Sequence, residues 1–146
     1  MTAIGVAFPD FFKLITATQI TLDLSGTKLT RIEADTFGEW KKSKEVKLPD
    51  CLAEVGNAFQ GSGLVTIDLS GTKVAKLDEF AFDGCMELKE VKLPDCLAKI
   101  RASAFRDCPN LTSMNFPPSL KPKNVDSAAF NNSPIKKQWR LAKKGR

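Results

Sequence analysis

The sequence contains no histidine and no tyrosine. Without histidine it lacks the Ser-His and Cys-His pairs of nucleophilic catalysis, and it carries no G-x-S-x-G or P-loop motif. Its carboxylates fall at positions expected to face solvent and form no evident acid–base pair. The four cysteines include no C-x-x-C, so the sequence also indicates no zinc site. We therefore expect a protein that is not an enzyme and that uses no cofactor and no metal.

Long hydrophobic runs are also missing. No apolar run approaches the ~18 residues that a membrane-spanning helix requires. Residues 1–19 lack the basic n-region of a signal peptide, and Asp10 interrupts their apolar part. The chain is therefore expected either to be intracellular or to have lost a leader.

Acidic residues are scarce at the C-terminal end. Residues 121–146 contain eight basic residues and one acid, for a net charge of +7, whereas residues 1–120 contain 14 basic and 16 acidic residues, for a net charge of −2. The overall net charge of +5 is thus a property of the tail.

What the sequence does contain is repetition. The stretch VKLPDCLA occurs at residues 46–53 and again at 91–98, and DLSGTK occurs at 23–28 and 68–73, both at a separation of 45 residues. Each 45-residue unit is itself two shorter turns, because phenylalanines recur at intervals of 22, 23, 23 and 25 residues. These residues are Phe37, Phe59, Phe82, Phe105 and Phe130. Such a period is typical of repeat proteins, in which each unit buries its apolar face against its neighbours.

Each turn contains one pair of alternating apolar residues, which is the period of a strand with one buried face. The pairs are Leu22/Leu24, Val46/Leu48, Ile67/Leu69, Val91/Leu93 and Met114/Phe116. Stacked, these strands would form a parallel sheet with a spacing of about 4.8 Å. Later in each turn come two further buried columns, and the phenylalanine column closes the turn.

The unit C-x-x-L-x-x-V-x-L-P-x-x-L-x-x-I-x-x-x-A-F, read from Cys85 to Phe105, resembles the BspA-like leucine-rich repeat family. The resemblance implies an α/β leucine-rich repeat solenoid of about five turns of 22–25 residues, with a short parallel β-sheet on the concave face. It also implies recognition rather than catalysis, since members are often surface or secreted binding proteins such as adhesins. Two turns depart from the pattern, with DLSGT in place of the LP turn.

We expect three segments along the chain. Residues 1–18 form an N-terminal cap with a short helix at 8–17, and Ile4 begins what looks like the closing half of an incomplete repeat. Residues 19–134 form the leucine-rich repeat solenoid. Residues 135–146 form a basic C-terminal tail or capping helix, because Ile135 and Trp139 share one helical stripe among basic residues.

Exposed strand positions suggest the binding site. The residue between the two buried positions of each strand is polar, and these residues are Asp23, Lys47, Asp68, Lys92 and Asn115. Their flanking neighbours Glu45, Thr66 and Glu90 extend the surface. One interpretation is a ladder of opposite charges that fixes strand register. The other is a mixed-charge face that binds a protein partner, since a nucleic acid would require one continuous positive sign.

The basic tail has three interpretations: a cap on the last turn, a contact with nucleic acid or an anionic membrane or with a partner such as calmodulin, and a nuclear-import signal. Its residues are Lys136, Lys137, Trp139, Arg140, Lys143, Lys144 and Arg146. We therefore expect a non-catalytic protein-binding module with no small-molecule substrate. The alternatives are an accessory protein held by its tail and a structural subunit of a larger assembly.

Cysteines occupy two kinds of position. Cys85 and Cys108 lie at the same place in adjacent turns, where they form either a disulfide or, as we favour, two buried thiols, since Ser62 and Ser133 fill this position elsewhere. Thr27, Cys51, Thr72, Cys96 and Ser119 form another column, whose small polar groups can hydrogen-bond the loop backbone.

Overall fold

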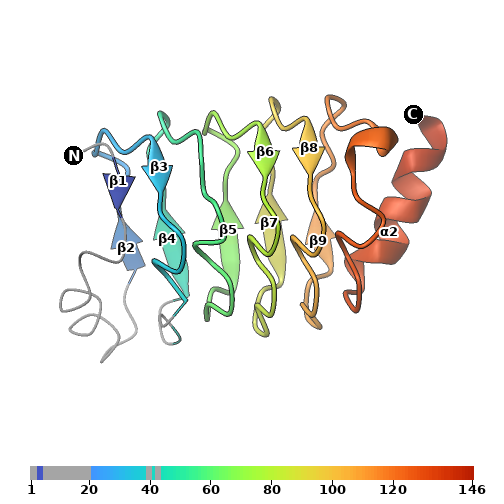
Figure 1. The fold of residues 1–146 in the computed structure, drawn as a ribbon, viewed down its shortest axis with the longest axis horizontal. Coiled ribbons are helices and arrows are strands. Elements are labelled where there is room, and N and C mark those ends of the chain that lie inside the picture. The colour runs from blue at the N-terminus through green and yellow to red at the C-terminus, as the bar shows by residue number, and fades with distance from the viewer. Residues whose placement is uncertain (1–2, 5–20, 39–40, 42–43) are drawn as a thin grey trace.

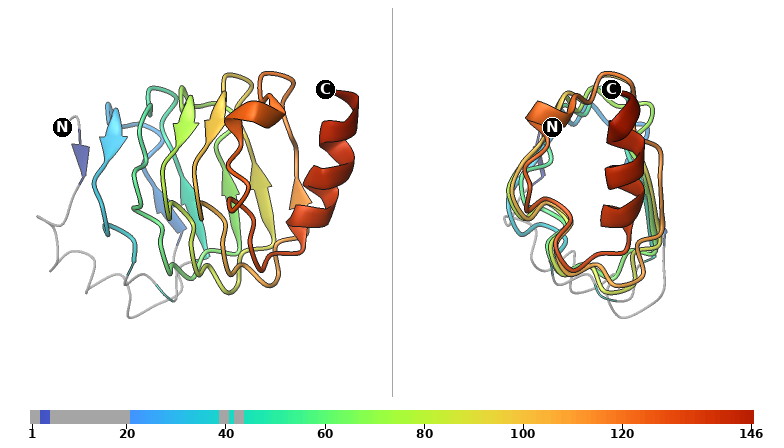
Figure 2. Two further views of the ribbon diagram at one scale, coloured as in Figure 1. Left: turned by 45° about the vertical axis from the view of Figure 1, so that its right-hand side comes forward. Right: turned by 90° about the vertical axis from the view of Figure 1, so that its right-hand side faces the viewer.

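The structure, a computed structural model, describes residues 3–4, 21–38, 41 and 44–146. The helix predicted at residues 8–17 lies outside the described residues, as does all of the proposed N-terminal cap except Ala3–Ile4. Within the described residues the chain consists of short parallel strands with little helix. Successive turns stack along the long axis of the molecule, and they overlay one another when the molecule is viewed end-on (Figures 1 and 2).

One side of the stack carries the predicted strands. They are β2 (Thr21–Asp23), β4 (Glu45–Lys47), β5 (Thr66–Asp68), β7 (Glu90–Lys92) and β9 (Ser113–Met114). β2 pairs with β4, and β5, β7 and β9 form a three-stranded sheet, all parallel. Within these pairs Leu22 lies opposite Val46, and Ile67 opposite Val91. The central residues of β4, β5 and β7 are buried while their third residues are exposed, so the predicted alternation is confirmed there.

The other side carries shorter strands, which are β1 (Ala3–Ile4), β3 (Arg31–Ile32), β6 (Lys76–Leu77) and β8 (Lys99–Ile100). β1 pairs with β3, and β6 pairs with β8, again in parallel. Ile4 lies opposite Ile32, so β1 pairs with a strand of the second half of the following turn. The rest of the incomplete repeat proposed at residues 4–8 lies outside the described residues. Single bridges from Arg31 to Glu54 and from Ile100 to Val125 continue this side.

The phenylalanines that close the turns form one stacked column inside the molecule. The rings of Phe37, Phe59, Phe82 and Phe105 stack with centroid separations of 4.9, 5.2 and 5.1 Å and interplanar angles of 5° or less. Phe130 ends the column at 5.8 Å from Phe105. All five rings are buried, and they belong to one continuous hydrophobic core. The column predicted from the repeat period is therefore confirmed.

The polar column acts on the backbone as predicted. Cys51 donates to the carbonyl of Leu29 in the preceding turn at 3.1 Å, and Ser119 donates likewise to Leu97 at 2.6 Å. Thr72 instead donates within its own turn, to Leu69 at 2.8 Å. The hydroxyls and thiols thus satisfy carbonyls that the short strands leave without a ladder partner.

Helical structure among the described residues lies near the C-terminus. It comprises the 3-10 segments η1 (Pro122–Asn124) and η2 (Lys143–Gly145) and the helix α2 (Ile135–Ala142). Ile135 and Trp139 are the buried residues of α2, as their shared stripe predicts. The Trp139 ring lies 5.2 Å from Phe116 and 6.3 Å from Phe130, so α2 lies against the last turn of the stack (Figure 2).

Replacing Phe82 by alanine is expected to lower the free energy of unfolding by about 3–5 kcal/mol, because it empties an enclosed site between two stacked rings. Urea denaturation followed by circular dichroism measures the change. Met86→Ala is the control, since Met86 is 58% exposed, and its effect should stay within about 0.5 kcal/mol. A loss below ~1 kcal/mol for Phe82→Ala would contradict a core role for the column.

Candidate functional site

The predicted partner-binding residues lie together on the outer surface of the first set of strands. Asp23, Lys47, Asp68 and Lys92, which we call the charged row, are the third residues of β2, β4, β5 and β7, and all are exposed. Asp23 lies directly opposite Lys47, and Asp68 opposite Lys92. The stacking of the turns thus brings together residues that are separated by up to 69 positions in the chain.

A second line of side chains runs beside the charged row. It contains the first residues of the same strands, and we call it the flanking row: Thr21, Glu45, Thr66 and Glu90. Thr21 lies opposite Glu45, and Thr66 opposite Glu90. The structure therefore places Glu45, Thr66 and Glu90 beside the charged row, as the sequence predicts.

The aspartates of the charged row are held in the ionised form. Oδ1 of Asp68 accepts hydrogen bonds from the amide of Ser70 at 2.9 Å and from its hydroxyl at 2.5 Å. These bonds, chiefly the one from the hydroxyl, place the pKa of Asp68 below its ordinary value, and nearby Lys92 lowers it further. Asp23 and Ser25 repeat this arrangement, and the pKa of Asp23 is lowered in the same way. Both carboxylates therefore carry their charge at neutral pH.

The lysines of the charged row remain available for an external contact. Within the part of the chain that the structure describes, neither Lys47 nor Lys92 forms an ion pair. Because the lysines alternate with aspartates, neighbouring charges attract one another, but no lysine of the row is held in a direct ion pair among the described residues.

Asn115 differs from the other predicted residues. Its Oδ1 accepts from the amide of Leu93 at 2.6 Å, and its Nδ2 donates to the carbonyl of Leu93 at 3.0 Å. The side-chain amide of Asn115 thus takes the place of a backbone hydrogen-bond partner for Leu93, in the neighbouring turn. Asn115 therefore bonds the backbone of the neighbouring turn, and the only sequence feature that sets it apart is that it is uncharged in a column of charged residues.

The row of strands β2, β4, β5, β7 and β9 is not one continuous sheet, because its ladder of hydrogen bonds is interrupted between β4 and β5. These strands lie side by side, and the amide of Val65 donates to Lys44 at 3.0 Å near their start, but they share no ladder pairing. Leu24 and Leu69 donate to the third residue of the next strand at 2.8 Å, whereas the equivalent amide of Leu48 has no such acceptor among the described residues. The break falls where an LPD turn is followed by a DLSGT turn.

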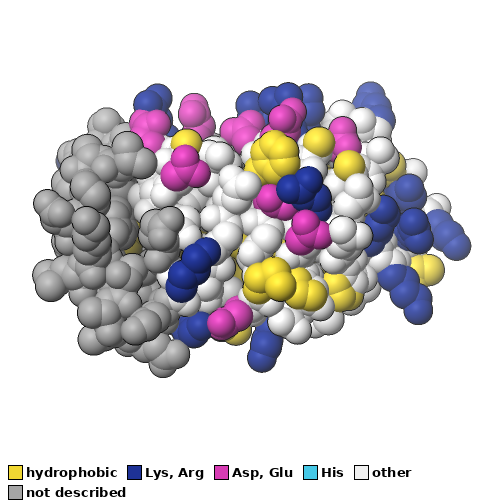
Figure 3. Space-filling view, turned by 60° about the horizontal axis from the view of Figure 1, so that its bottom comes forward, with side chains coloured by type: hydrophobic (Ala, Val, Ile, Leu, Met, Phe, Trp, Pro, Cys, Tyr) yellow, Lys and Arg dark blue, Asp and Glu magenta, His cyan; other side chains and the backbone are white. Residues whose placement is uncertain are grey.

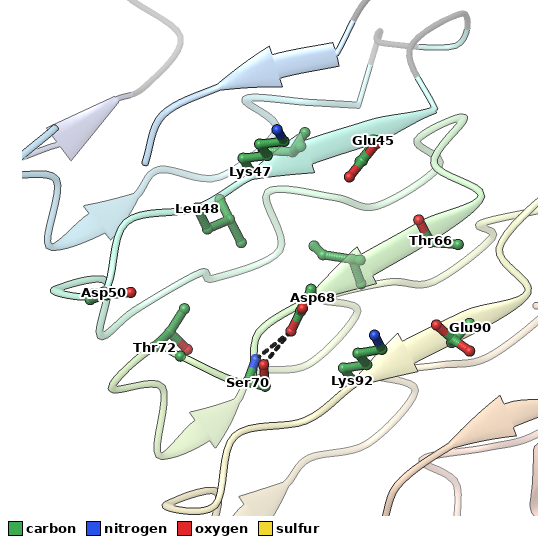
Figure 4. Close-up of a pocket in the computed structure, with 13 residues that line it drawn as sticks. Glu45, Lys47, Leu48, Asp50, Thr66, Asp68, Ser70, Thr72, Glu90 and Lys92 are labelled. Atoms are coloured by element: carbon green, nitrogen blue, oxygen red, sulfur yellow. Dashed lines mark hydrogen bonds between the residues drawn. The ribbon is translucent and has the colours of Figure 1, made fainter. Parts of the chain in front are cut away.

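A groove with a volume of about 480 Å³ overlies this break, and we call it the β4–β5 groove (Figure 4). Six of the eight predicted partner-binding residues line it: Glu45, Lys47, Thr66, Asp68, Glu90 and Lys92. Asp23 and Asn115 lie outside the groove. The face is therefore hollowed at its centre, between the two 45-residue units.

Sequence reasoning missed the turn residues that form one end of the groove. They are Asp50, Ser70, Gly71 and Thr72. A Cβ atom on Gly71 would lie 3.2 Å from Oδ1 of Asp50, so glycine keeps this end open, whereas a Cβ on the equivalent Gly26 would meet no atom within 4 Å. The repeated DLSGTK and LPD stretches contain these residues, but only the stacked turns show that they meet.

The basic residues of the tail divide into those that hydrogen-bond to the last turn and those that do not. Arg146 donates to the carbonyls of Pro117 and Leu120 at 2.6 and 3.0 Å, and its guanidinium lies 5.7 Å from the Trp139 ring centre. Lys136 donates to Asn131 at 2.6 Å, and Gln138 donates to the Thr112 carbonyl beside β9 at 2.5 Å. These contacts tie α2 to the last turn.

The other basic residues of the tail, Lys137, Arg140, Lys143 and Lys144, are exposed. Basic side chains gather at this end of the molecule (Figure 3). Lys136, Arg140 and Lys143 also border a hollow between η1 and α2, together with the acid Asp126. This end therefore offers a positive surface that is separate from the β4–β5 groove.

Buried thiols complete the inventory of reactive groups. Sγ of Cys85 donates to the Phe59 carbonyl and Sγ of Cys108 to the Phe82 carbonyl, both at 3.1 Å, and both thiols are free. The pKa of Cys108 is raised by its hydrogen bond with Cys85 and by burial, so this thiol stays protonated. Ser133 fills the same position one turn later and donates to Phe105 at 2.5 Å. These thiols therefore act as hydrogen-bond donors to backbone carbonyls.

Among the residues that the structure describes, no group of three or more histidine, cysteine, aspartate or glutamate side chains is placed to hold a metal ion. In the same residues, no helix has the length and hydrophobicity needed to cross a bilayer.

Comparison with known proteins agrees with the stacked turns. A solved leucine-rich repeat protein from Eubacterium ventriosum superposes with a TM-score of 0.56 at 21% identity, over 81% of this chain and 44% of that one. The chain thus spans less than half the length of that structure. A search of curated proteins gave no match. The family model for the BspA-type leucine-rich repeat region matches six copies over residues 9–136. The chain therefore belongs to the BspA-type leucine-rich repeat family.

Proposed function

We propose that the chain is a non-catalytic protein-binding module, built as a solenoid of about five turns that recognises its partner through the face formed by β2, β4, β5, β7 and β9, the concave side of such a solenoid. The family supports an interaction scaffold in general. The observation that carries the choice of face is the β4–β5 groove, which collects six predicted residues from three different turns.

The charges of the face favour a protein over a nucleic acid. Basic and acidic residues alternate along the charged row, and the flanking row adds only acids and threonines. A phosphate backbone binds best to a continuous positive surface, because its affinity depends on the number of phosphates neutralised. A protein surface, which carries both signs, can match an alternating row.

The termini are proposed to close the stack. Residues 135–146 act as a capping helix on residues 19–134, since α2 buries Trp139, and Gln138 and Arg146 donate to the backbone carbonyls of Thr112 and Pro117. Residues 1–18 remain a predicted N-terminal cap. Uncapped ends of a repeat stack expose core, so both segments would protect solubility.

The second candidate function is an anionic contact through the tail, with a nucleic acid or a membrane surface. The exposed residues Lys137, Arg140, Lys143 and Lys144 favour it. The apolar stripe of α2 is turned into the fold, however, so the helix has little left to insert into a bilayer. A structural subunit of a larger assembly is the third possibility, and it predicts self-association through the ends of the stack.

The face is tested with a charge reversal. Lys92→Glu should reduce capture of specific partners from native extract by roughly two- to fivefold, the range of an exposed ion pair, without lowering the melting temperature. Lys99→Glu is the matched control, because Lys99 is an exposed residue of β8 outside the groove. Captured proteins are quantified by mass spectrometry. Equal losses with both variants, or none with either, would exclude this face as the binding site.

The tail is tested without disturbing the cap. Neutralising Lys137, Arg140, Lys143 and Lys144 to glutamine should leave capture by the face unchanged and should not alter its dependence on salt. Truncation is a poorer test, because it also removes Trp139 and Arg146 from the last turn. A steep salt dependence that disappears in the glutamine variant would instead support the anionic contact.

The capping role predicts a stability effect. Trp139→Ala should cost about 3–5 kcal/mol of unfolding free energy, because the buried ring packs on Phe116 and Phe130. Leu141→Ala is the control on the same helix: Leu141 is 60% exposed, and its change should stay within about 0.5 kcal/mol. Chemical denaturation measures both. Equal small effects would mean that α2 is not part of the folded unit.

A further inference from the structure

Aspartate and lysine alternate along the charged row. From β2 to β7 the charged row reads Asp23, Lys47, Asp68, Lys92, so each aspartate is followed by a lysine. This order arises because the 45-residue unit is duplicated and each unit contributes one aspartate and one lysine. Reversing the direction of the row exchanges every aspartate with a lysine. The row is therefore complementary to a reversed copy of itself.

We propose that this face binds the same face of a second copy of the chain. The proposal rests on the proposed function and names the partner. A two-fold axis between β4 and β5, parallel to the strands and in the plane of contact, would reverse the row. Lys47 would then face Asp68 of the second copy, and Asp23 would face Lys92. Because such a contact is isologous, each pairing occurs twice.

The flanking row obeys the same arrangement. Under this axis Glu45 faces Thr66 of the second copy, and Glu90 faces Thr21. Two acids therefore meet hydroxyls, which can donate hydrogen bonds to them, and no acid meets another acid. Both rows thus avoid like charges, although only one of them alternates in sign.

Three other axes pair the charged row less well. An axis lying on the charged row and parallel to it would place every residue of the row opposite itself, so that Lys47 met lysine and Asp68 met aspartate. An axis through β5 would set Lys47 against Lys92. An axis between β5 and β7 pairs Asp68 with Lys92 but leaves Asp23 without a partner. Of these axes, the one between β4 and β5 pairs all four charges of the charged row with opposite charges.

The local geometry suits this axis. It passes over the β4–β5 groove, whose volume of about 480 Å³ provides room for Lys47 of the second copy to approach Asp68. The hydrogen bonds from Ser70 use Oδ1 of Asp68, so Oδ2 makes no hydrogen bond within the described residues. Because Lys47 and Lys92 form no ion pair there either, pairing across the axis would not require breaking one.

The size of the face sets the expected strength. The four strands that face each other across this axis, at about 4.8 Å apart, span only about 15 Å. The contact area is therefore small, at or below that of the smallest specific interfaces. Exposed ion pairs contribute little individually, and salt screens them. We therefore expect a weak, salt-sensitive dimer that forms at high protein concentration.

The test uses two variants, each of which should associate poorly with itself but should associate with the other. Lys47→Asp sets carboxylates against each other at both equivalent places across the axis, and Asp68→Lys sets ammonium groups against each other. Each variant alone should associate roughly tenfold or more weakly than the wild type. In an equimolar mixture, opposite charges face each other again, and association should return. Sedimentation equilibrium at low salt measures all four samples.

Controls separate folding from pairing. Lys99→Asp changes the charge equally on β8, off this face, and should associate like the wild type. The double variant Lys47→Asp/Asp68→Lys exchanges the pair within one chain and should also associate like the wild type. Circular dichroism and melting temperatures establish that each variant is folded, and high salt should weaken every dimer.

Several outcomes would overturn the proposal: a monomeric wild type at several hundred micromolar in low salt, single variants that associate as strongly as the wild type, or a mixture that stays monomeric. These outcomes leave the proposed function intact if Lys92→Glu still reduces capture of other proteins. Loss of both the dimer and the selective capture would remove the face from either role.

Discussion

The apolar face of each described turn is buried against the turns beside it, with α2 covering the last one, and this stacking of like residues is the constraint on which the rest depends. The phenylalanine rings make this visible, since four of them lie 4.9–5.2 Å apart and almost parallel. A column of this kind requires successive turns to follow nearly the same path, although their lengths differ by up to three residues. The surface residues of successive turns are stacked in the same order, because the packing of the core fixes the position of each turn.

Two turn types alternate along the stack, and this alternation shapes the face. In a DLSGT turn the serine donates hydrogen bonds to an ionised aspartate, as Ser70 does to Asp68. An LPD turn instead comes directly after a lysine, Lys47 or Lys92. Where a DLSGT turn precedes an LPD turn, the strands pair, as in β2–β4 and β5–β7. Where LPD precedes DLSGT, between β4 and β5, the ladder is interrupted and the groove forms. The charge order and the groove therefore share one origin, the duplicated unit.

Much of the fold could be predicted because a short period in sequence becomes a repeat in space. The alternation at Val46, Ile67 and Val91, the phenylalanine column and the buried stripe of Ile135 and Trp139 all followed from spacing. The role of Asn115 could not, because an amide can serve a partner or the backbone, and only its position beside Leu93 selects the backbone. Arg146 likewise read as a free basic residue, but it bonds the carbonyls of the last turn.

By itself, the sequence determined the repeat, the family, the residues of the core columns and the order of charges on the exposed strand positions. Each of these depends on residue type and spacing, which the chain carries directly. The tertiary structure alone decided that the ladder breaks between β4 and β5, that Asp50 and Gly71 meet at one end of a groove, and which tail residues are packed. These features depend on hydrogen bonds and distances between turns, which residue spacing within a turn does not specify.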